Sequence, residues 1–235
     1  MAILDEAVVL NDGSLMPKIG VIGTNDAELA KAVKMGYRLL ACPADKNLDL
    51  TKVSPQLYVE IEISEEIKTR EELRNSFKII RNNLVKNHAD LCLLKLSDDL
   101  KRNDEVWQEL EQLKIKGWVK TLGVTRANAD ELTDILQKAQ VKPSVVETEI
   151  EDQGVIALAR KNKMQVEVPV HGDIEALTEL AENYKTMPVE LVLRYFNQKS
   201  IIPLIEAGDA VKNPKTDFVI KGADMSTIGQ LFSGK

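Results

Sequence analysis

The sequence predicts an α/β fold, a (β/α)8 TIM barrel preceded by a β-hairpin, with shortened loops and no C-terminal tail. The first observation is alternation: in Leu57–Ser64, Ser144–Ile150 and Gln165–Val170, aliphatic residues on one face oppose glutamates on the other. A period of two is typical of strands. The second is that strand and helix patterns alternate along the chain, which favours a parallel sheet covered by helices. The third is the count, because eight such strands in 235 residues favour closure into a barrel.

The strands are predicted from their apolar patterns and flanking turn residues. Val8–Leu10 and Leu15–Pro17 flank the turn-forming segment Asn11–Ser14, which indicates a hairpin. The eight barrel strands are expected at Lys18–Ile22, Tyr37–Pro43, Leu57–Ser64, Ala89–Leu96, Val119–Thr125, Ser144–Ile150, Gln165–Val170 and Ser200–Ile205. The polar segment Ala44–Gln56 is interpreted as a loop.

The helices are predicted from apolar residues at helical spacing and from capping residues. Asn25 and Glu28 form a capping box before a helix that stops at Gly36. Further helices are expected at Glu65–Lys86, at Asp104–Lys116, after Asn128, at Gln153–Asn162, after Asp173, from Pro188, and near Asp224–Phe232. Because no linker or low-complexity segment interrupts this series, we predict one domain over residues 1–235.

Composition excludes several classes of function. The net charge of −6 gives no basic footprint for nucleic acid or an anionic membrane surface. No apolar run reaches the roughly 18 residues of a membrane span, and the N-terminus lacks the features of a signal peptide. Two cysteines and two histidines form no disulfide framework and no metal-binding motif. We therefore expect a cytoplasmic monomer without a metal.

A closed barrel turns one face of each strand inward. Because the aliphatic face packs on the helices, the glutamates should face the interior, near the mouth where active sites of this fold are built. The residues expected there are Glu60, Glu62, Glu147, Glu149 and Glu167 with Lys95, and Arg126 at the rim. Lys95 is expected to pair with Glu62.

Such a group of carboxylates cannot stay fully ionised in a dry site. The alternatives are a hydrated, internally hydrogen-bonded interior, a bound cationic molecule, or a divalent metal, which no sequence motif specifies. A Schiff-base role for Lys95 is disfavoured, because neighbouring carboxylates raise the pKa of a lysine. Antiparallel strands with one solvated face would give the same alternation.

Several segments resemble the aldo-keto reductase family, whose members are (β/α)8 barrels that reduce carbonyl groups with NADPH. Gly117–Thr125, GWVKTLGVT, is similar to the family segment GKVRxIGVS. The other matching segments are Leu10–Pro17, Gly36–Leu40, Asp90–Leu94, Leu193–Tyr195 and Ile202–Pro203. The resemblance runs with gaps from about Leu10 to Leu231.

The resemblance also locates four catalytic positions, normally an Asp, a Tyr, a Lys and a His. In this chain they are occupied by Ala41, by Lys46 or a neighbour, by Glu62 and by Lys95. Neither Glu62 nor Lys95 replaces a phenol as an acid at neutral pH without a large shift of its pKa.

The cofactor positions implied by the resemblance differ as well. The Ser-Asn and the Gln that hold the nicotinamide amide correspond to Thr125, Arg126 and Glu147, and the stacking Tyr corresponds to Pro169. The Lys-Ser that holds the 2′-phosphate corresponds to Leu204-Ile205, and a later Arg falls near Asp209. We therefore expect no cofactor, and NADPH only if the family activity persists.

Three functions follow from these positions. We expect a protein that has lost carbonyl reduction, is not an enzyme, and binds an unknown small molecule or a protein partner. The alternative is an NAD(P)H-dependent oxidoreductase with an atypical active site, in which Tyr37 or Tyr58 supplies a phenol. A third is an enzyme of another class that uses Glu62, Lys95 and Glu147 as acid–base groups.

Overall fold

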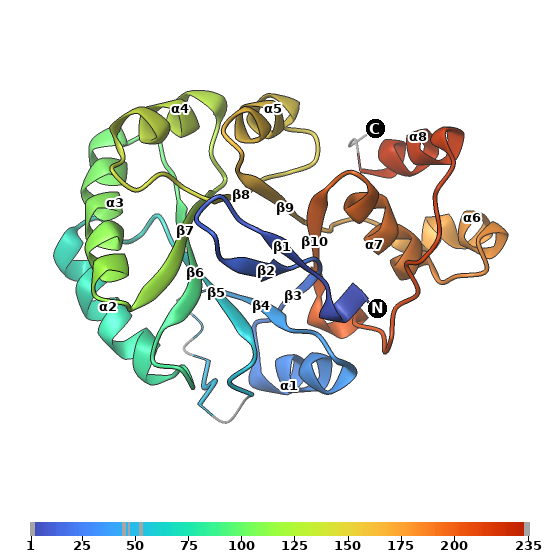
Figure 1. Ribbon diagram of the computed structural model, residues 1–235, viewed down its shortest axis with the longest axis horizontal. Coiled ribbons are helices and arrows are strands. Elements are labelled where there is room, and N and C mark those ends of the chain that lie inside the picture. The colour runs from blue at the N-terminus through green and yellow to red at the C-terminus, as the bar shows by residue number, and fades with distance from the viewer. Residues whose placement is uncertain (1–2, 44–45, 47, 52–53, 233–235) are drawn as a thin grey trace.

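The structure is a computed structural model that describes residues 3–43, 46, 48–51 and 54–232. Residues 44, 45, 47, 52 and 53 of the predicted loop Ala44–Gln56 lie outside the described residues. Figure 1 shows a ring of strands surrounded by helices.

The predicted barrel is confirmed. Its strands close in the order β10-β3-β4-β5-β6-β7-β8-β9, and every neighbouring pair is parallel. The strands are β3 Gly20–Ile22, β4 Leu39–Pro43, β5 Tyr58–Ile63, β6 Ala89–Lys95, β7 Val119–Thr125, β8 Val145–Glu147, β9 Gln165–Pro169 and β10 Ile201–Glu206. The ring closes where Leu204 pairs with Gly20. All strands therefore end on one side, which forms the mouth.

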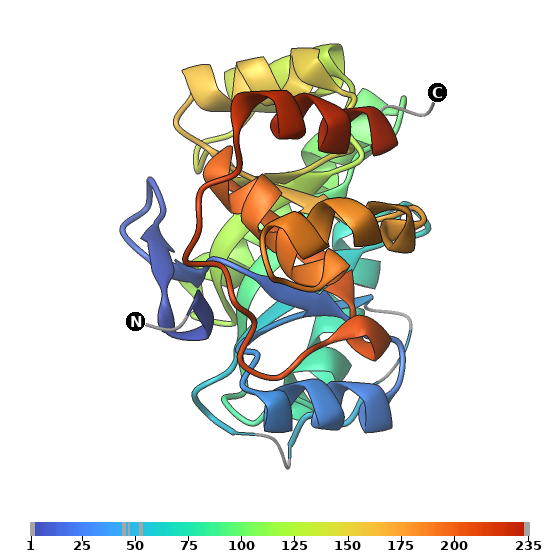
Figure 2. The ribbon, with the colours of Figure 1, turned by 90° about the vertical axis from the view of Figure 1, so that its right-hand side faces the viewer.

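The N-terminal hairpin closes the opposite end. Its antiparallel strands, β1 (Ala7–Val9) and β2 (Leu15–Pro17), lie across the barrel in Figure 1 and outside one of its ends in Figure 2. The hydroxyl of Thr121 donates to Asp12 of the turn at 3.0 Å, and Met16 packs into the barrel interior. The interior is thereby sealed from the side where the strands begin.

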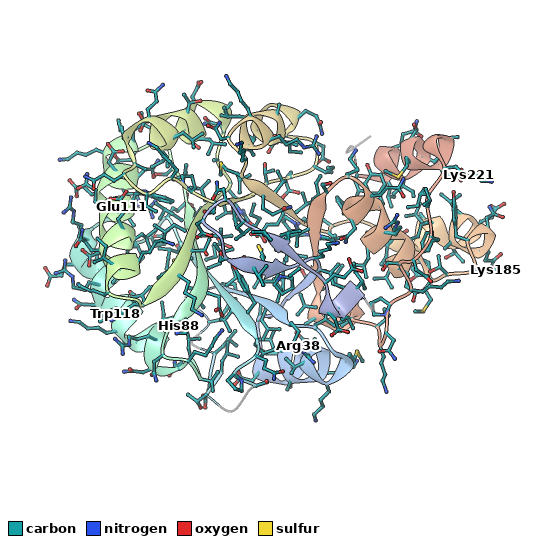
Figure 3. The ribbon with its side chains drawn as sticks, in the orientation of Figure 1. Arg38, His88, Glu111, Trp118, Lys185 and Lys221 are labelled. Atoms are coloured by element: carbon teal, nitrogen blue, oxygen red, sulfur yellow. The ribbon has the colours of Figure 1, made fainter. Side chains whose placement is uncertain are left out.

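Helices cover the outside of the ring. They are α1 Asp26–Met35, α2 Arg70–Asn82, α3 Leu100–Ile115, α4 Ala129–Lys138, α5 Gln153–Lys161, α6 Thr178–Asn183, α7 Pro188–Gln198 and α8 Gly222–Leu231, with short 3-10 turns at Ile3–Asp5, Ile174–Leu177 and Ala207–Asp209. Figure 3 places Trp118 and Glu111 beside α2 and α3, and Lys185 and Lys221 beside α6 and α8 across the molecule.

The second helix begins later than Glu65, the start predicted from its apolar stripe. Thr69 is its N-cap: its hydroxyl accepts the Glu72 N–H, and the Glu72 carboxylate accepts the Thr69 N–H. This capping box fixes the start of α2 at Arg70. Residues 64–69 are consequently free to form a loop at the mouth.

The core has two layers separated by the strands. The outer layer lies between strands and helices and contains Val59, Ile61, Phe77 and Trp107. The inner layer fills the lower barrel with Leu10, Met16, Leu39, Ala41, Tyr58, Leu91, Leu93, Val145, Ile202 and Leu204. The barrel is thus packed with side chains below the mouth.

Gly123 shows how closely the interior is packed. A Cβ at this position would lie 2.5 Å from Leu93 Cδ2 and 2.7 Å from the Val145 carbonyl oxygen, which belongs to the neighbouring strand. We expect Gly123→Ala to lower the free energy of unfolding by about 1–3 kcal/mol, measured by urea denaturation. Gly154→Ala in α5 is the control, because a Cβ there meets nothing within 4 Å and alanine favours helix. Equal stabilities for the two variants would contradict close packing at Gly123.

Candidate functional site

The inward orientation of the glutamates is confirmed for β5, β8 and β9. Val59 and Ile61 belong to the outer layer, so Glu60 between them faces the interior, where it lies in register with Ala41 and Leu91. Glu147 and Glu167 pair across β8 and β9 and face the same way. The alternation in the sequence therefore gives the correct face for each strand.

These three glutamates meet across the barrel. One carboxylate oxygen from each of Glu60, Glu147 and Glu167 lies within 4.8 Å of the other two. Because β5 and β8 are separated by two strands in the ring, the side chains converge through the interior and not along one ladder. Glu60 is 1% exposed, Glu167 is 0% exposed, and Glu147, nearest the mouth, is 8% exposed. We call these three residues the carboxyl cluster.

The carboxyl cluster has few hydrogen-bond partners. The Thr125 hydroxyl donates to Glu147 Oε1. The Glu60 and Glu167 carboxyl groups lie within hydrogen-bond reach of each other. Apart from this contact, Glu60 Oε2 and both oxygens of Glu167 have no partner among the described residues. No Lys, Arg or His of the described residues forms an ion pair with the cluster. Buried polar atoms are normally bonded, so the cluster is an exception.

Burial dominates the electrostatics of the cluster. Loss of water raises the pKa of Glu60 and of Glu167 well above the ordinary value, and the neighbouring carboxylates raise both further. Burial also raises the pKa of Glu147 to about 7, while the Thr125 hydroxyl and the Arg126 charge oppose the rise. The three groups therefore cannot all be ionised at neutral pH without a compensating charge.

Lys95 does not pair with Glu62, contrary to expectation. Its ammonium lies 3.0 Å from Glu65 Oε1, in the loop that follows β5. Glu62 is in register with Leu93, whereas Lys95 is in register with Thr125, one layer closer to the mouth. The Glu65 carboxylate of the loop reaches this layer and therefore pairs with Lys95.

Glu149 does not join the cluster either. Strand β8 ends at Glu147, and the Glu149 carbonyl accepts the Asp152 N–H at 3.1 Å in the turn that leads to α5. The side chain is exposed. Of the five glutamates expected inside, the structure brings together three, with Glu62 half-buried at the mouth.

Arg126 lies at the rim, as expected. It follows β7 directly, has a left-handed backbone with φ 52°, and its N–H donates to the Glu147 carbonyl at 3.3 Å. A left-handed conformation is unfavourable for a residue with a side chain, and such residues are common at functional sites. The guanidinium is exposed beside Glu147.

No tyrosine reaches the mouth. Tyr37 packs outside the strands, and burial raises its pKa to about 12. Tyr58 faces inward but lies two residues before Glu60, toward the hairpin end. Tyr184 and Tyr195 belong to the outer helical layer. Ala41 is buried in the interior and Lys46 is exposed, so neither supplies a phenol's chemistry.

Arg102 also shapes the mouth, although no sequence pattern predicted it. It is 3% exposed and donates to the carbonyls of Ser64, Ile67 and Lys95 at 2.7–2.9 Å, which joins the ends of β5 and β6. The available signal was an arginine one turn after the Asp99 cap, in a helix that also buries the polar residues Asn103, Glu109 and Glu111.

A separate cavity of about 260 Å³ lies toward the hairpin end, lined in part by Lys18, Gln165 and Arg194. Lys18 is paired with Glu6 at 2.6 Å. Its two carboxylates form no buried cluster, because Glu6 is paired with Lys18 and Asp217 is exposed, so the mouth is the stronger candidate. Among the described residues no helix is both long and apolar enough to cross a membrane.

Known proteins resemble the chain along most of its length. Glyoxal reductase of Bacillus subtilis is 24% identical over 261 residues, which cover 97% of this chain and 93% of that protein. Aldo-keto reductase family 1 member A1 of Gallus gallus is 25% identical over 151 residues, so this match spans about half of each protein, 54% and 46%. The crystal structure of a Bombyx mori aldo-keto reductase in complex with NADP superposes with a TM-score of 0.83 at 18% identity and covers 97% of this chain and 93% of that one.

The expectation that the chain is not an enzyme is therefore wrong. It rested on the four changed catalytic positions alone, whereas the similar proteins are named as reductases, which points to an oxidoreductase. The changed positions show how this site differs from the family pattern, and they do not show that the protein lacks enzymatic activity. The expectation of no cofactor likewise has no support from these proteins.

The family model for aldo/keto reductases matches residues 23–168, more than half of the chain. The match extends from the end of β3 to β9 and so includes every member of the carboxyl cluster. It agrees with the closed parallel barrel of the structure. The chain belongs to the aldo/keto reductase family.

Proposed function

We propose that this protein is an NAD(P)H-dependent oxidoreductase with an atypical active site at the barrel mouth. The observation that carries the proposal is the family match across the strands that build the mouth. Additional support comes from the side chains gathered there, which include an exposed cation, a buried hydroxyl and carboxyl groups. Barrels of this architecture place their chemistry at this end.

The residues at the mouth fit the nicotinamide end of such a cofactor. A carboxamide needs a hydrogen-bond acceptor and a donor, and Glu147, Thr125 and Arg126 offer both within one region. These are also the positions at which the family resemblance implies nicotinamide contacts. We assign them this role, and the bound cofactor would supply a hydride to a carbonyl carbon.

Carbonyl reduction also requires a group that neutralises the charge developing on the carbonyl oxygen. No phenol lies at the mouth, because all four tyrosines are deep in the barrel or outside it. This role must fall to the inward carboxyl groups or to something that they bind. Of the inward carboxyl groups, those of Glu62 and Glu147 lie nearest the opening of the barrel.

The segment after β10 fits a 2′-phosphate poorly. Glu206 and Asp209 are exposed there, with Lys212 as the nearby cation, whereas the resemblance implies Lys-Ser and Arg at this place. A phosphate next to two carboxylates is repelled. We therefore propose NADH as the preferred cofactor.

We expect NADH to bind about tenfold more tightly than NADPH, a difference of about 1.4 kcal/mol. The measurement is calorimetric titration of the full chain with each dinucleotide, followed by absorbance at 340 nm with a panel of aldehydes. Glu206→Arg with Asp209→Arg should bring the two affinities close together. Asp5→Arg with Asp217→Arg is the matched control, because both residues are exposed and lie away from the mouth. Failure of both dinucleotides to bind, with no aldehyde reduced, would refute the proposed function.

A further inference from the structure

We propose that Glu60, Glu147 and Glu167 bind one hard divalent cation inside the barrel. The inference goes beyond the proposed function, because binding of the ion needs neither dinucleotide nor carbonyl substrate. It also differs from the sequence expectation of no metal, which rested on the lack of a local motif. The three ligands come from three separate strands, so no such motif could show them.

The first argument is geometric. One oxygen from each carboxyl group lies within 4.8 Å of the other two. Ca²⁺ binds carboxylate oxygens at about 2.3–2.6 Å and Mg²⁺ at about 2.0–2.1 Å, so two ligands of one ion are at most roughly 5 Å apart. One oxygen of each glutamate is therefore close enough to the other two for all three to bind a single ion.

The second argument is the set of buried oxygens that no basic group or hydroxyl satisfies. Glu167 is fully buried, and outside the cluster both its oxygens and Glu60 Oε2 lack a partner among the described residues. The contact between the Glu60 and Glu167 carboxyl groups is a hydrogen bond only while they share a proton. Once that proton leaves, the buried oxygens are unbonded, which is costly, and a cation between the three glutamates would bind one oxygen of each.

The third argument is charge. The cluster has no ion pair with any described basic residue: Lys95 is occupied by Glu65, and Arg126 is exposed at the rim. Apolar side chains surround the cluster: Ala41 and Leu91 are in register with Glu60, and Ile202 is in register with Glu167. A divalent cation offsets two of the three negative charges in this surrounding.

The ion has a route of entry. Glu147 retains 8% exposure at the mouth, while Glu60 and Glu167 lie behind it. Thr125 holds only Glu147 Oε1, which leaves Oε2 for the ion. The Thr125 hydroxyl orients the ligand in the way that outer hydrogen bonds position ligands in metal sites.

The test is a titration of the full chain with Mn²⁺ at pH 8, followed by electron paramagnetic resonance of the free ion. Carboxylate sites accept Mn²⁺ as well as Ca²⁺ and Mg²⁺, so Mn²⁺ serves as the probe. We expect one Mn²⁺ per chain, displaced by an excess of Ca²⁺ or Mg²⁺. Glu167→Gln should raise the dissociation constant at least tenfold, and Glu60→Gln/Glu147→Gln/Glu167→Gln should abolish binding.

Glu179→Gln is the matched control, since this glutamate is exposed on α6 and has no contact with the cluster; its affinity should equal that of the wild type. Near-ultraviolet circular dichroism establishes that each variant is folded, and where the triple variant is not, Glu147→Gln alone replaces it. Lack of Mn²⁺ binding to the folded wild type at millimolar concentration overturns the inference, as does unchanged binding in the cluster variants. Cation binding without dinucleotide binding would sustain this inference and refute only the proposed function.

Discussion

With a chelator present, Glu147→Gln is expected to make the protein more stable than the wild type at pH 8, by about 3 kcal/mol. Burial raises the pKa of Glu147 from the ordinary 4.5 to about 7 in the folded protein. The folded state therefore holds a proton that the unfolded state has lost. This contribution to stability is fully present below pH 4.5 and disappears as the pH rises through 7. A pKa that differs by one between the folded and unfolded states corresponds to about 1.4 kcal/mol, which gives the expected size.

The measurement is urea unfolding of both proteins from pH 5 to pH 8. The difference between variant and wild type should be small at pH 5 and grow toward pH 8, because glutamine carries no charge at either pH. Glutamine retains an oxygen that accepts the Thr125 hydroxyl, so this hydrogen bond is preserved. Taking the difference also cancels the titration of the surface carboxylates that the two proteins share.

Glu60 and Glu167 should behave in the same direction, since burial raises the pKa of each carboxyl group. Glu179→Gln on α6 provides the control that should not depend on pH, because that side chain is exposed and away from the cluster. If Glu147→Gln were less stable than the wild type at pH 8 in chelator, the carboxyl group would be held in its ionised form by a partner within the protein. The electrostatics described for the cluster would then be incorrect.

The alternation of side chains was sufficient to predict the barrel and its inner face. Residues such as Val59, Glu60 and Ile61 must point to opposite sides of a strand whatever surrounds them. Eight such patterns separated by helices leave few topologies, so closure of the ring also followed from the sequence. The inward position of Glu60, Glu147 and Glu167 is a direct consequence.

The parts of the site that the sequence did not predict depend on loops. Lys95 pairs with Glu65 because the chain turns back over the mouth after β5, and no periodic pattern encodes that turn. Glu149 is outside because β8 ends at Glu147, three residues before the end of the predicted strand, and the chain then turns with a hydrogen bond between Glu149 and Asp152. Tertiary contacts decide where a strand stops, and short-range patterns do not.

The resemblance to the family predicted the place of the site correctly, but it did not predict the function of the site. It located the mouth and the positions of interest, and the family match confirms the assignment. It misled where the absence of a phenol was taken as the absence of catalysis. A changed side chain such as Glu62 alters the chemistry available to a site, and function belongs to the site and not to the fold.

Arg102→Met is expected to lower the free energy of unfolding by about 3–5 kcal/mol. The guanidinium is buried and donates to three backbone carbonyls, those of Ser64, Ile67 and Lys95, at 2.7–2.9 Å. Methionine has a similar length and fills the space without a donor. Each carbonyl left without a partner costs roughly 1–3 kcal/mol, partly recovered where water enters.

Urea unfolding at one pH measures this effect, with Arg160→Met as the matched control. Arg160 is exposed and donates to one carbonyl, that of Lys199 at 3.1 Å, so its replacement should change stability by less than about 0.5 kcal/mol. Arg102→Lys should fall between the wild type and Arg102→Met, because a single ammonium cannot reach three carbonyls in a planar fork.

The distinction between Lys and Met at this position separates two roles for Arg102. If the side chain only fills space, the two variants should be equally stable. If its donors join the strand ends, Arg102→Met should also speed hydrogen exchange of the Leu96 N–H, which donates to Thr125 across the ends of β6 and β7 at 3.2 Å. The Lys95 carbonyl immediately before it would have lost the guanidinium that fixes it. These strand ends frame the opening above the carboxyl cluster. Local opening of the ends of β6 and β7 would therefore also increase the mobility of the mouth.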